Sequence, residues 1–132
     1  MLIDQNSSLR QRRTDLQERT QTFAANVRTF VRSVPKTIVI LDDLKQLIRS
    51  SGSVGANYIE ARAAVSKKDF LYRIRICRKE AEESLFWLSL IQEHIDDVHK
   101  KKCLILLQEI RELASIFTAG AKKMESSIAS SN

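Results

Sequence analysis

Residues 70–95 read FLYRIRICRKEAEESLFWLSLIQEHI, and this stretch decides the fold class. Its apolar and small side chains recur at alternating steps of four and three, at Phe70, Ile74, Cys77, Ala81, Ser84, Leu88, Ile91 and Ile95. That spacing places them on one face of an α-helix and forms a heptad-like seam. At about 1.5 Å per residue, the helix would be roughly 40 Å long. Ser66 and Asp69 just before this stretch have the spacing of an N-terminal capping box.

Three further stretches show the same helical spacing. The first runs from Thr14 to Pro35, which disfavours helical geometry at the residue before it. The second begins near Thr37, the expected N-cap, and passes through small residues at 50–56. That run either breaks the helix or lets a neighbouring helix approach closely, and the spacing beyond it favours one continuous helix. The last stretch, which follows residues 70–95 in the chain, begins after Asp96 and Asp97, which are natural helix caps.

The composition agrees with an all-α fold of one domain. The chain has 132 residues, with 3 glycines and 1 proline, too few to turn a many-stranded sheet. Four amphipathic helices with short connections predict an antiparallel up-down-up-down four-helix bundle. We expect the bundle to occupy residues 14–125, between a flexible basic arm at 1–13 and a disordered tail at 126–132.

Basic residues outnumber acidic ones. The chain has 22 Lys and Arg against 16 Asp and Glu, a net charge of +6, which favours anionic partners. A run of like charges is often only a solvated face. If the chain binds RNA or DNA through phosphates, the expected contacts are the basic residues of the arm and of the third helix: Arg10, Arg12, Arg13, Lys67, Lys68, Arg75, Arg78 and Lys79.

Several classes of function lack a supporting pattern. The chain shows no secretory signal and no apolar run long enough to span a membrane, so we expect a cytoplasmic protein with no membrane partner. Cys77 and Cys103 form no CxxC pair and are expected to be reduced, with Cys77 in the core. No nucleophile–base arrangement, phosphate-binding glycine loop or metal-ligand spacing occurs. We therefore expect no catalytic residues, no metal and no cofactor, and a protein that is not an enzyme.

Three segments, taken in order and spacing, resemble a known family. They are QLIRS and SVGANYIEA within residues 46–61, SKKDF at 66–70, and KEAEESLFWL at 79–88. They resemble the bacterial four-helix-bundle proteins encoded in intervening sequences of large-subunit ribosomal RNA genes, to which accessory proteins of diversity-generating retroelements are similar. The resemblance implies a homo-oligomeric ring, of five subunits in the family pattern, with no established enzymatic activity. The retroelement relatives bind a reverse transcriptase and nucleic acid, which makes such a polymerase an implied partner.

Polar residues of the same segments are expected to hold the second and third helices together. In a hairpin around Ser66, facing residues have numbers that sum to about 132. This predicts three pairs that fix the register of the hairpin: Arg49 with Glu83, Glu60 with Arg73, and Asn57 with Arg75. Glu80 belongs to the same structural network. A role for these residues in a ligand site is the alternative.

Two functions remain open from the sequence. The first is a non-catalytic basic oligomer that binds nucleic acid through phosphate contacts. The alternative is a scaffold that contacts only protein and has no nucleic-acid role. Both need a subunit interface, for which we expect the apolar residues outside the main seams: Ile59, Ile76, Phe86 and Trp87.

Overall fold

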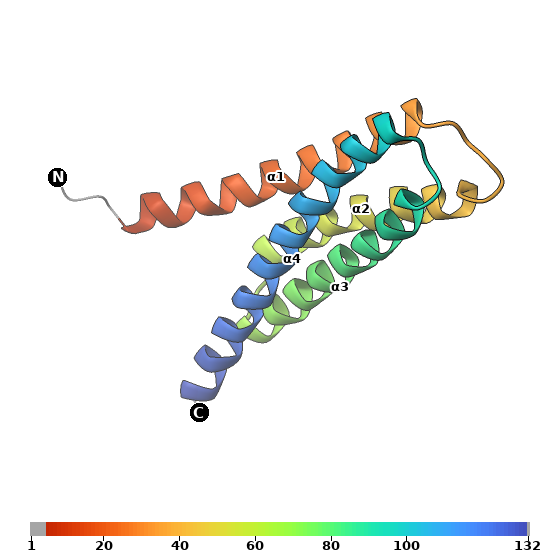
Figure 1. Ribbon diagram of the computed structural model, residues 1–132. Coiled ribbons are helices and arrows are strands. Elements are labelled where there is room, and N and C mark those ends of the chain that lie inside the picture. The colour runs from red at the N-terminus through yellow and green to blue at the C-terminus, as the bar shows by residue number, and fades with distance from the viewer. Residues whose placement is uncertain (1–4, 132) are drawn as a thin grey trace.

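The computed structural model describes residues 5–131, with side chains from Asp15 onward. Within that part of the chain there are four helices and no strand: α1 (Gln5–Ser33), α2 (Leu41–Arg62), α3 (Lys67–Gln92) and α4 (Asp97–Ser130). Each helix packs on the next in the chain, and α1 also packs on α4 (Figure 1). The expected all-α fold with four helices is confirmed.

Two of the predicted helix caps are confirmed. At the start of α3, the Ser66 side chain accepts a hydrogen bond from the Asp69 backbone N–H at 3.0 Å. The Asp69 carboxylate in turn accepts from the Val65 N–H at 3.4 Å. At the start of α4, Asp96 accepts from the His99 N–H at 3.0 Å. The bonds to Ser66 and Asp96 satisfy N–H groups that the first turn of a helix leaves without a partner.

The predicted start of α2 at Thr37 is wrong. The helix begins at Leu41, after Ile40, whose side chain makes no capping bond. The Thr37 carbonyl instead accepts from the Ile40 and Leu41 N–H groups, which forms a turn. Ile40 is completely buried, so we attribute the late start to a loop that first brings this side chain into the core. Beyond it, α2 is continuous through the small residues 50–56, as predicted.

The first and last helices of the chain, α1 and α4, are longer than the sequence predicted. The backbone of α1 is helical from Gln5, so residues 5–13, which we expected to lie before the first helix as a basic arm, are part of that helix. The backbone of α4 is helical to Ser130, through most of the expected tail. No glycine or proline interrupts either extension, and so nothing in the local sequence ends the helix there. Residues 1–4 and 132 lie outside the described residues.

The core follows the seams read from the sequence. Within residues 70–95, the six inner positions from Ile74 to Ile91 are buried, and Phe70 and Ile95 are half-buried against them. Small side chains bring α2 and α3 close together. Ser50 and Ser84 are both completely buried, and their hydroxyl oxygens lie 2.8 Å apart in a hydrogen bond.

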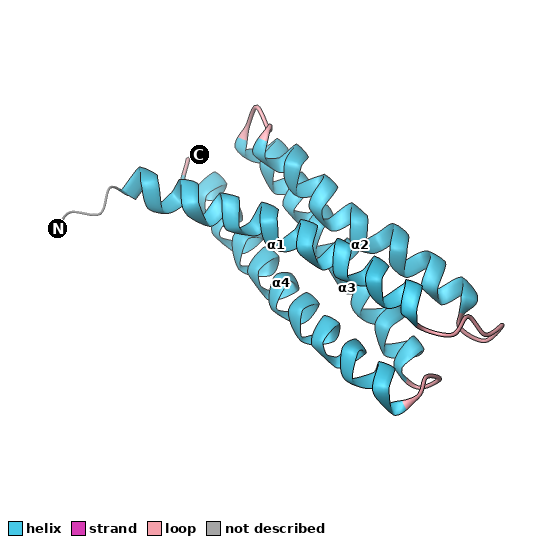
Figure 2. Cartoon of the chain, turned by 90° about the horizontal axis from the view of Figure 1, so that it is seen from above, coloured by secondary structure: helices cyan, strands magenta, loops and turns pink. Residues whose placement is uncertain are grey.

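The helices do not stay together along their whole length. In Figure 1, the N-terminal part of α1 and the C-terminal part of α4 diverge from each other. Figure 2 shows the α2–α3 connection at one end and the other two connections at the opposite end. The helices therefore lie further apart at the end with the α2–α3 connection, which we call the open end, than at the end with the other two connections.

Alanine substitution of two glycines is expected to change stability in opposite directions. A Cβ added at Gly55 would lie 3.1 Å from the Oγ1 of Thr20, a buried residue that cannot easily move. A Cβ at Gly120 would meet only the Ile74 Cγ2, at 3.9 Å. Gly55→Ala should therefore lower the free energy of unfolding by about 1 kcal/mol, and Gly120→Ala should raise it by about 0.5–1 kcal/mol. Urea unfolding followed by circular dichroism measures both, and equal signs would contradict the packing described for Gly55.

Candidate nucleic-acid interface

The first half of α3 concentrates positive charge. Residues 67–79, KKDFLYRIRICRK, contain six Lys or Arg and one Asp, a net charge of +5. The N-terminus of a helix carries partial positive charge, so basic residues there oppose the helix dipole. Lys67 and Lys68 nevertheless lie in the first turn of α3. The dipole of α3 therefore does not explain why these two residues are basic.

Four residues of this half form an outward stripe on α3. Lys68, Tyr72, Arg75 and Lys79 follow one another at steps of four, three and four, and all four are exposed. They extend over roughly 16 Å of helix. Tyr72 is 58% exposed, and the Arg73 guanidinium carbon lies 5.5 Å from the centre of its ring. We call Lys68, Tyr72, Arg75 and Lys79 the α3 stripe.

Sequence reasoning missed Tyr72. The search for apolar periodicity counted residues that face the core, and Tyr72 lies outside that seam. Its position between basic residues at helical spacing was the available signal. An exposed aromatic ring between cations is the combination that single-stranded nucleic-acid sites use for base stacking.

The predicted basic residues of α3 have different partners. Arg75 donates to the Glu125 carboxylate on α4 at 2.9 Å. Lys67 donates to the hydroxyls of Ser127 and Ser131, at 2.9 and 3.3 Å. Within the part of the chain whose side chains are described, no ion pair involves the three others, Lys68, Arg78 and Lys79. The side chains of Arg10, Arg12 and Arg13 lie outside the described residues.

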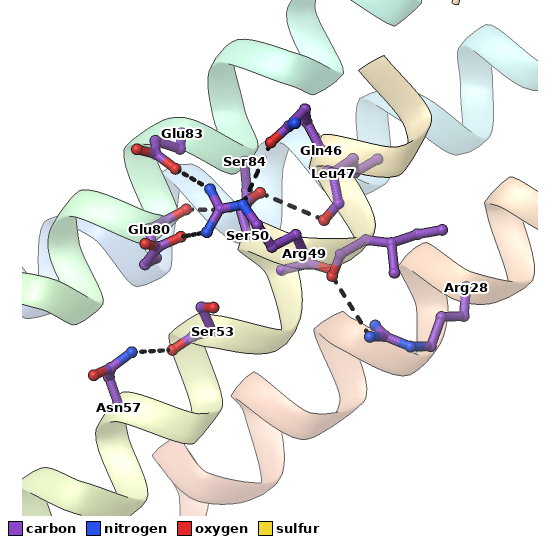
Figure 3. Close-up of polar contacts among 12 residues, drawn as sticks. Arg28, Gln46, Leu47, Arg49, Ser50, Ser53, Asn57, Glu80, Glu83 and Ser84 are labelled. Carbon is purple, nitrogen blue, oxygen red and sulfur yellow. Dashed lines mark hydrogen bonds and ion pairs between the residues drawn. The ribbon is translucent and has the colours of Figure 1, made fainter. Parts of the chain in front are cut away.

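The second half of α3 is acidic and joins α2 through Arg49 (Figure 3). The Arg49 guanidinium donates to Glu80 at 3.2 Å and also to Glu83, as the hairpin register predicted for Glu83. The Glu80 side chain is only 9% exposed, and that of Arg49 is 49% exposed. The hydrogen bond to Glu83 is the largest of the effects that raise the pKa of Arg49, and partial desolvation opposes it. The pairs therefore fix a partly buried contact between α2 and α3.

The other two predicted pairs are not formed. Asn57 accepts from Arg73 at 3.5 Å and donates to the Ser53 carbonyl at 2.9 Å, so its pairing with Arg75 is wrong. Arg73 and Arg75 are two positions apart, which turns them about 200° around the helix axis. One therefore faces α2 and the other faces α4. Glu60 is exposed and forms no ion pair with Arg73 among the described side chains, because Arg73 contacts Asn57 instead.

The four apolar residues predicted for a subunit interface do not share one exposed patch. Ile59 and Phe86 are each 54% exposed, whereas Ile76 and Trp87 are half-buried. Trp87 packs against the core and against Phe86, with ring centroids 4.9 Å apart. In the hairpin register, Ile59 and Phe86 are roughly 20 Å apart along the bundle axis. Trp87 therefore contributes to the packing of its own chain.

Comparison with known proteins places this geometry in a family. The sequence model of the 23S rRNA-intervening sequence protein family matches residues 12–119. The chain belongs to this family. A crystal structure of a protein of unknown function from the S23 ribosomal protein family of Bacteroides thetaiotaomicron has a similar fold. Its TM-score is 0.68 at 24% sequence identity, over 83% of this chain and 97% of that one. A search of curated proteins gave no significant match.

In this family member, the structure offers no metal centre within the residues it describes. No group of three His, Cys, Asp or Glu among them is placed to hold a metal ion. Both thiols are buried, and burial raises the pKa of Cys77 to about 12 and that of Cys103 to about 11. Cys77 thus lies in the core, as predicted, and both cysteines are held as unreactive thiols. Over the described range, none of the helices combines the length and apolar character that crossing a bilayer requires.

Proposed function

We propose that the chain is a non-catalytic, basic, homo-oligomeric helical bundle that binds RNA or DNA through phosphate contacts. The observation that carries the proposal is the α3 stripe, an exposed row of cations with one exposed tyrosine on a rigid helix. Lysine and arginine bind phosphate through charge and gain free energy by releasing counterions from the nucleic acid. Lys68 and Lys79 of the stripe, together with the half-buried Arg78 beside it, supply these contacts without losing an ion pair described within the chain.

The stripe suits recognition of the nucleic-acid backbone. Its polar groups are almost all cationic, and such groups read phosphate positions, which carry little sequence information. Tyr72 adds a stacking surface that accepts any unpaired base. We therefore propose binding with little sequence preference, and stronger binding where unpaired bases lie close to the phosphates.

Assembly strengthens the proposal. A ring of five copies, the number that the family resemblance implies, would carry on the order of +30 in total. Several identical stripes on one particle would bind one polymer together, so that weak contacts add up. Ile59 of α2, an apolar side chain that is 54% exposed, supports contact between copies. A reverse transcriptase is the protein partner that the resemblance to retroelement accessory proteins implies.

A pair of double variants tests the proposed interface. Lys68→Ala/Lys79→Ala should weaken binding to a fluorescein-labelled single-stranded RNA about tenfold at low salt. It should also lower the slope of log affinity against log salt by about 1.4, because each phosphate contact on a single strand contributes roughly 0.7. The matched control is Lys101→Ala/Lys102→Ala, which removes the same charge from exposed residues at the opposite end of the bundle. Fluorescence anisotropy measures both.

The outcome separates this function from the alternative. A control variant that loses as much affinity as the α3 variant would show that net charge, and not the stripe, determines binding. Wild-type protein that forms oligomers but does not bind RNA or DNA at low salt would overturn the proposal in favour of a scaffold for protein contacts only.

A further inference from the structure

The open end of the bundle contains an apolar cavity of about 400 Å³. All four helices line it. Leu16 comes from α1, Tyr58 from α2, Phe70 and Ile74 from α3, and Ile116 and Phe117 from α4. Ligand pockets of proteins typically measure 300–1,000 Å³, are mostly apolar, and in helical bundles lie between the helices. This cavity meets each of these criteria.

Gly120 gives an independent reason to regard the cavity as a site. It lies in the middle of α4 and lines the cavity. A glycine inside a helix costs about 1 kcal/mol relative to alanine, so its presence needs a cause. At Gly55 the cause is close packing, because an added Cβ would meet the Oγ1 of the buried Thr20 at 3.1 Å. At Gly120 the nearest atom is 3.9 Å away, so packing within the chain does not require a glycine there. The missing side chain instead keeps the cavity open.

The polar groups at the cavity are cationic or neutral. Lys123 lines it, forms no ion pair among the described side chains, and is exposed. Ser127 lines it too and accepts a hydrogen bond from Lys67, which places a second ammonium group beside the same rim. Among the side chains described, from Asp15 to Ser131, no carboxylate lines the cavity, and Glu125, next to the lining residue Met124, pairs with Arg75. The rim is therefore complementary to an anionic group.

We propose that this cavity binds the acyl chain of a free fatty acid, with the carboxylate at Lys123 and Ser127. The apolar walls take up the methylene groups, and Met124 supplies a flexible side chain that adapts to an aliphatic chain. The carboxylate stays at the rim, where a lysine can donate to it and water can reach it. This site lies inside the bundle and does not depend on the nucleic-acid function of the α3 stripe.

Isothermal titration of the full chain with decanoate, kept below its micelle concentration, tests the proposal. One decanoate should bind per chain, and each methylene added from hexanoate to decanoate should strengthen binding about three- to fourfold. Decanol, which lacks the charge, should bind about tenfold more weakly. Gly120→Leu should abolish binding, because the leucine side chain would project into the cavity. Ala119→Leu, at the exposed neighbouring position, should leave binding unchanged.

Three results would overturn the proposal. The first is equal affinity of the wild type for decanoate and decanol. The second is full decanoate binding by a Gly120→Leu variant. The third is a wild type that binds no decanoate while Gly120→Leu changes the sedimentation mass, which would identify a second copy of the chain as the occupant. If Gly120→Leu fails to fold, Lys123→Gln replaces it, since this exposed side chain can be changed without repacking. That variant should bind decanoate about fivefold more weakly and decanol as the wild type does.

Discussion

Phe117→Ala is expected to destabilise the protein by about 3–5 kcal/mol, the usual cost of removing a buried phenyl ring. Phe117 is 1% exposed and lies between α4 and α2, with its ring centre 6.1 Å from that of Tyr58. It also borders the cavity of the open end, where the surrounding helices are least able to collapse into the space left behind. For a chain of this length, the expected decrease in Tm is roughly 10–20 °C.

Thermal unfolding at one fixed protein concentration measures the effect, because assembly makes Tm depend on concentration. The matched control is Phe86→Ala, which removes the same ring from a position that is 54% exposed. It should cost less than about 1 kcal/mol. Similar losses for the two variants would mean that Phe86 is buried in a subunit contact as firmly as Phe117 is in the core.

Arg49→Ala is expected to cost about 2 kcal/mol at neutral pH. It leaves the nearly buried Glu80 carboxylate without its cation, and breaking a fully buried pair costs about 3–5 kcal/mol. We reduce that figure because half of the Arg49 side chain is exposed, so solvent screens part of the interaction. Arg75→Ala is the control. It breaks a pair with Glu125 in which both side chains are about half exposed, and should cost less than about 1 kcal/mol.

A second substitution separates charge from packing. Glu80→Gln removes the charge but keeps the shape, so Arg49→Ala/Glu80→Gln should be more stable than Arg49→Ala alone. Urea unfolding of the four members of this double-mutant cycle gives the coupling free energy. If Glu80→Gln does not restore stability to the Arg49→Ala variant, the stability lost in Arg49→Ala comes from lost packing. The pair then has no part in fixing the α2–α3 register.

The sequence predicted those features that depend on local spacing. The seam of residues 70–95, the Ser66 and Asp96 caps and the unbroken α2 all follow from helical periodicity and side-chain chemistry within a few residues. The Arg49–Glu83 pair followed as well, because the short connection between α2 and α3 determines which residues of the two helices lie level with each other.

Features set by rotation around a helix, or by distant packing, were missed. Counting along the hairpin placed Arg75 beside Asn57, but Arg75 points to Glu125 on α4, a helix that the count ignored. The start of α2 depends on the burial of Ile40 by the whole core. Trp87 was expected on the surface because it lies outside the seam. It is half-buried, because α3 packs on both α2 and α4. The cavity at the open end depends on the divergence of α1 and α4, which no local pattern encodes.

The salt dependence of RNA binding by the wild-type chain tests the central claim most directly. If Lys68 and Lys79 of the α3 stripe and the neighbouring Arg78 of each copy contact phosphates, log affinity should fall linearly with log salt. For single-stranded RNA the slope should be about −2 for one engaged copy, and steeper when several copies bind one strand. An affinity that does not change with salt, or no binding at the lowest salt, would contradict phosphate recognition by the α3 stripe.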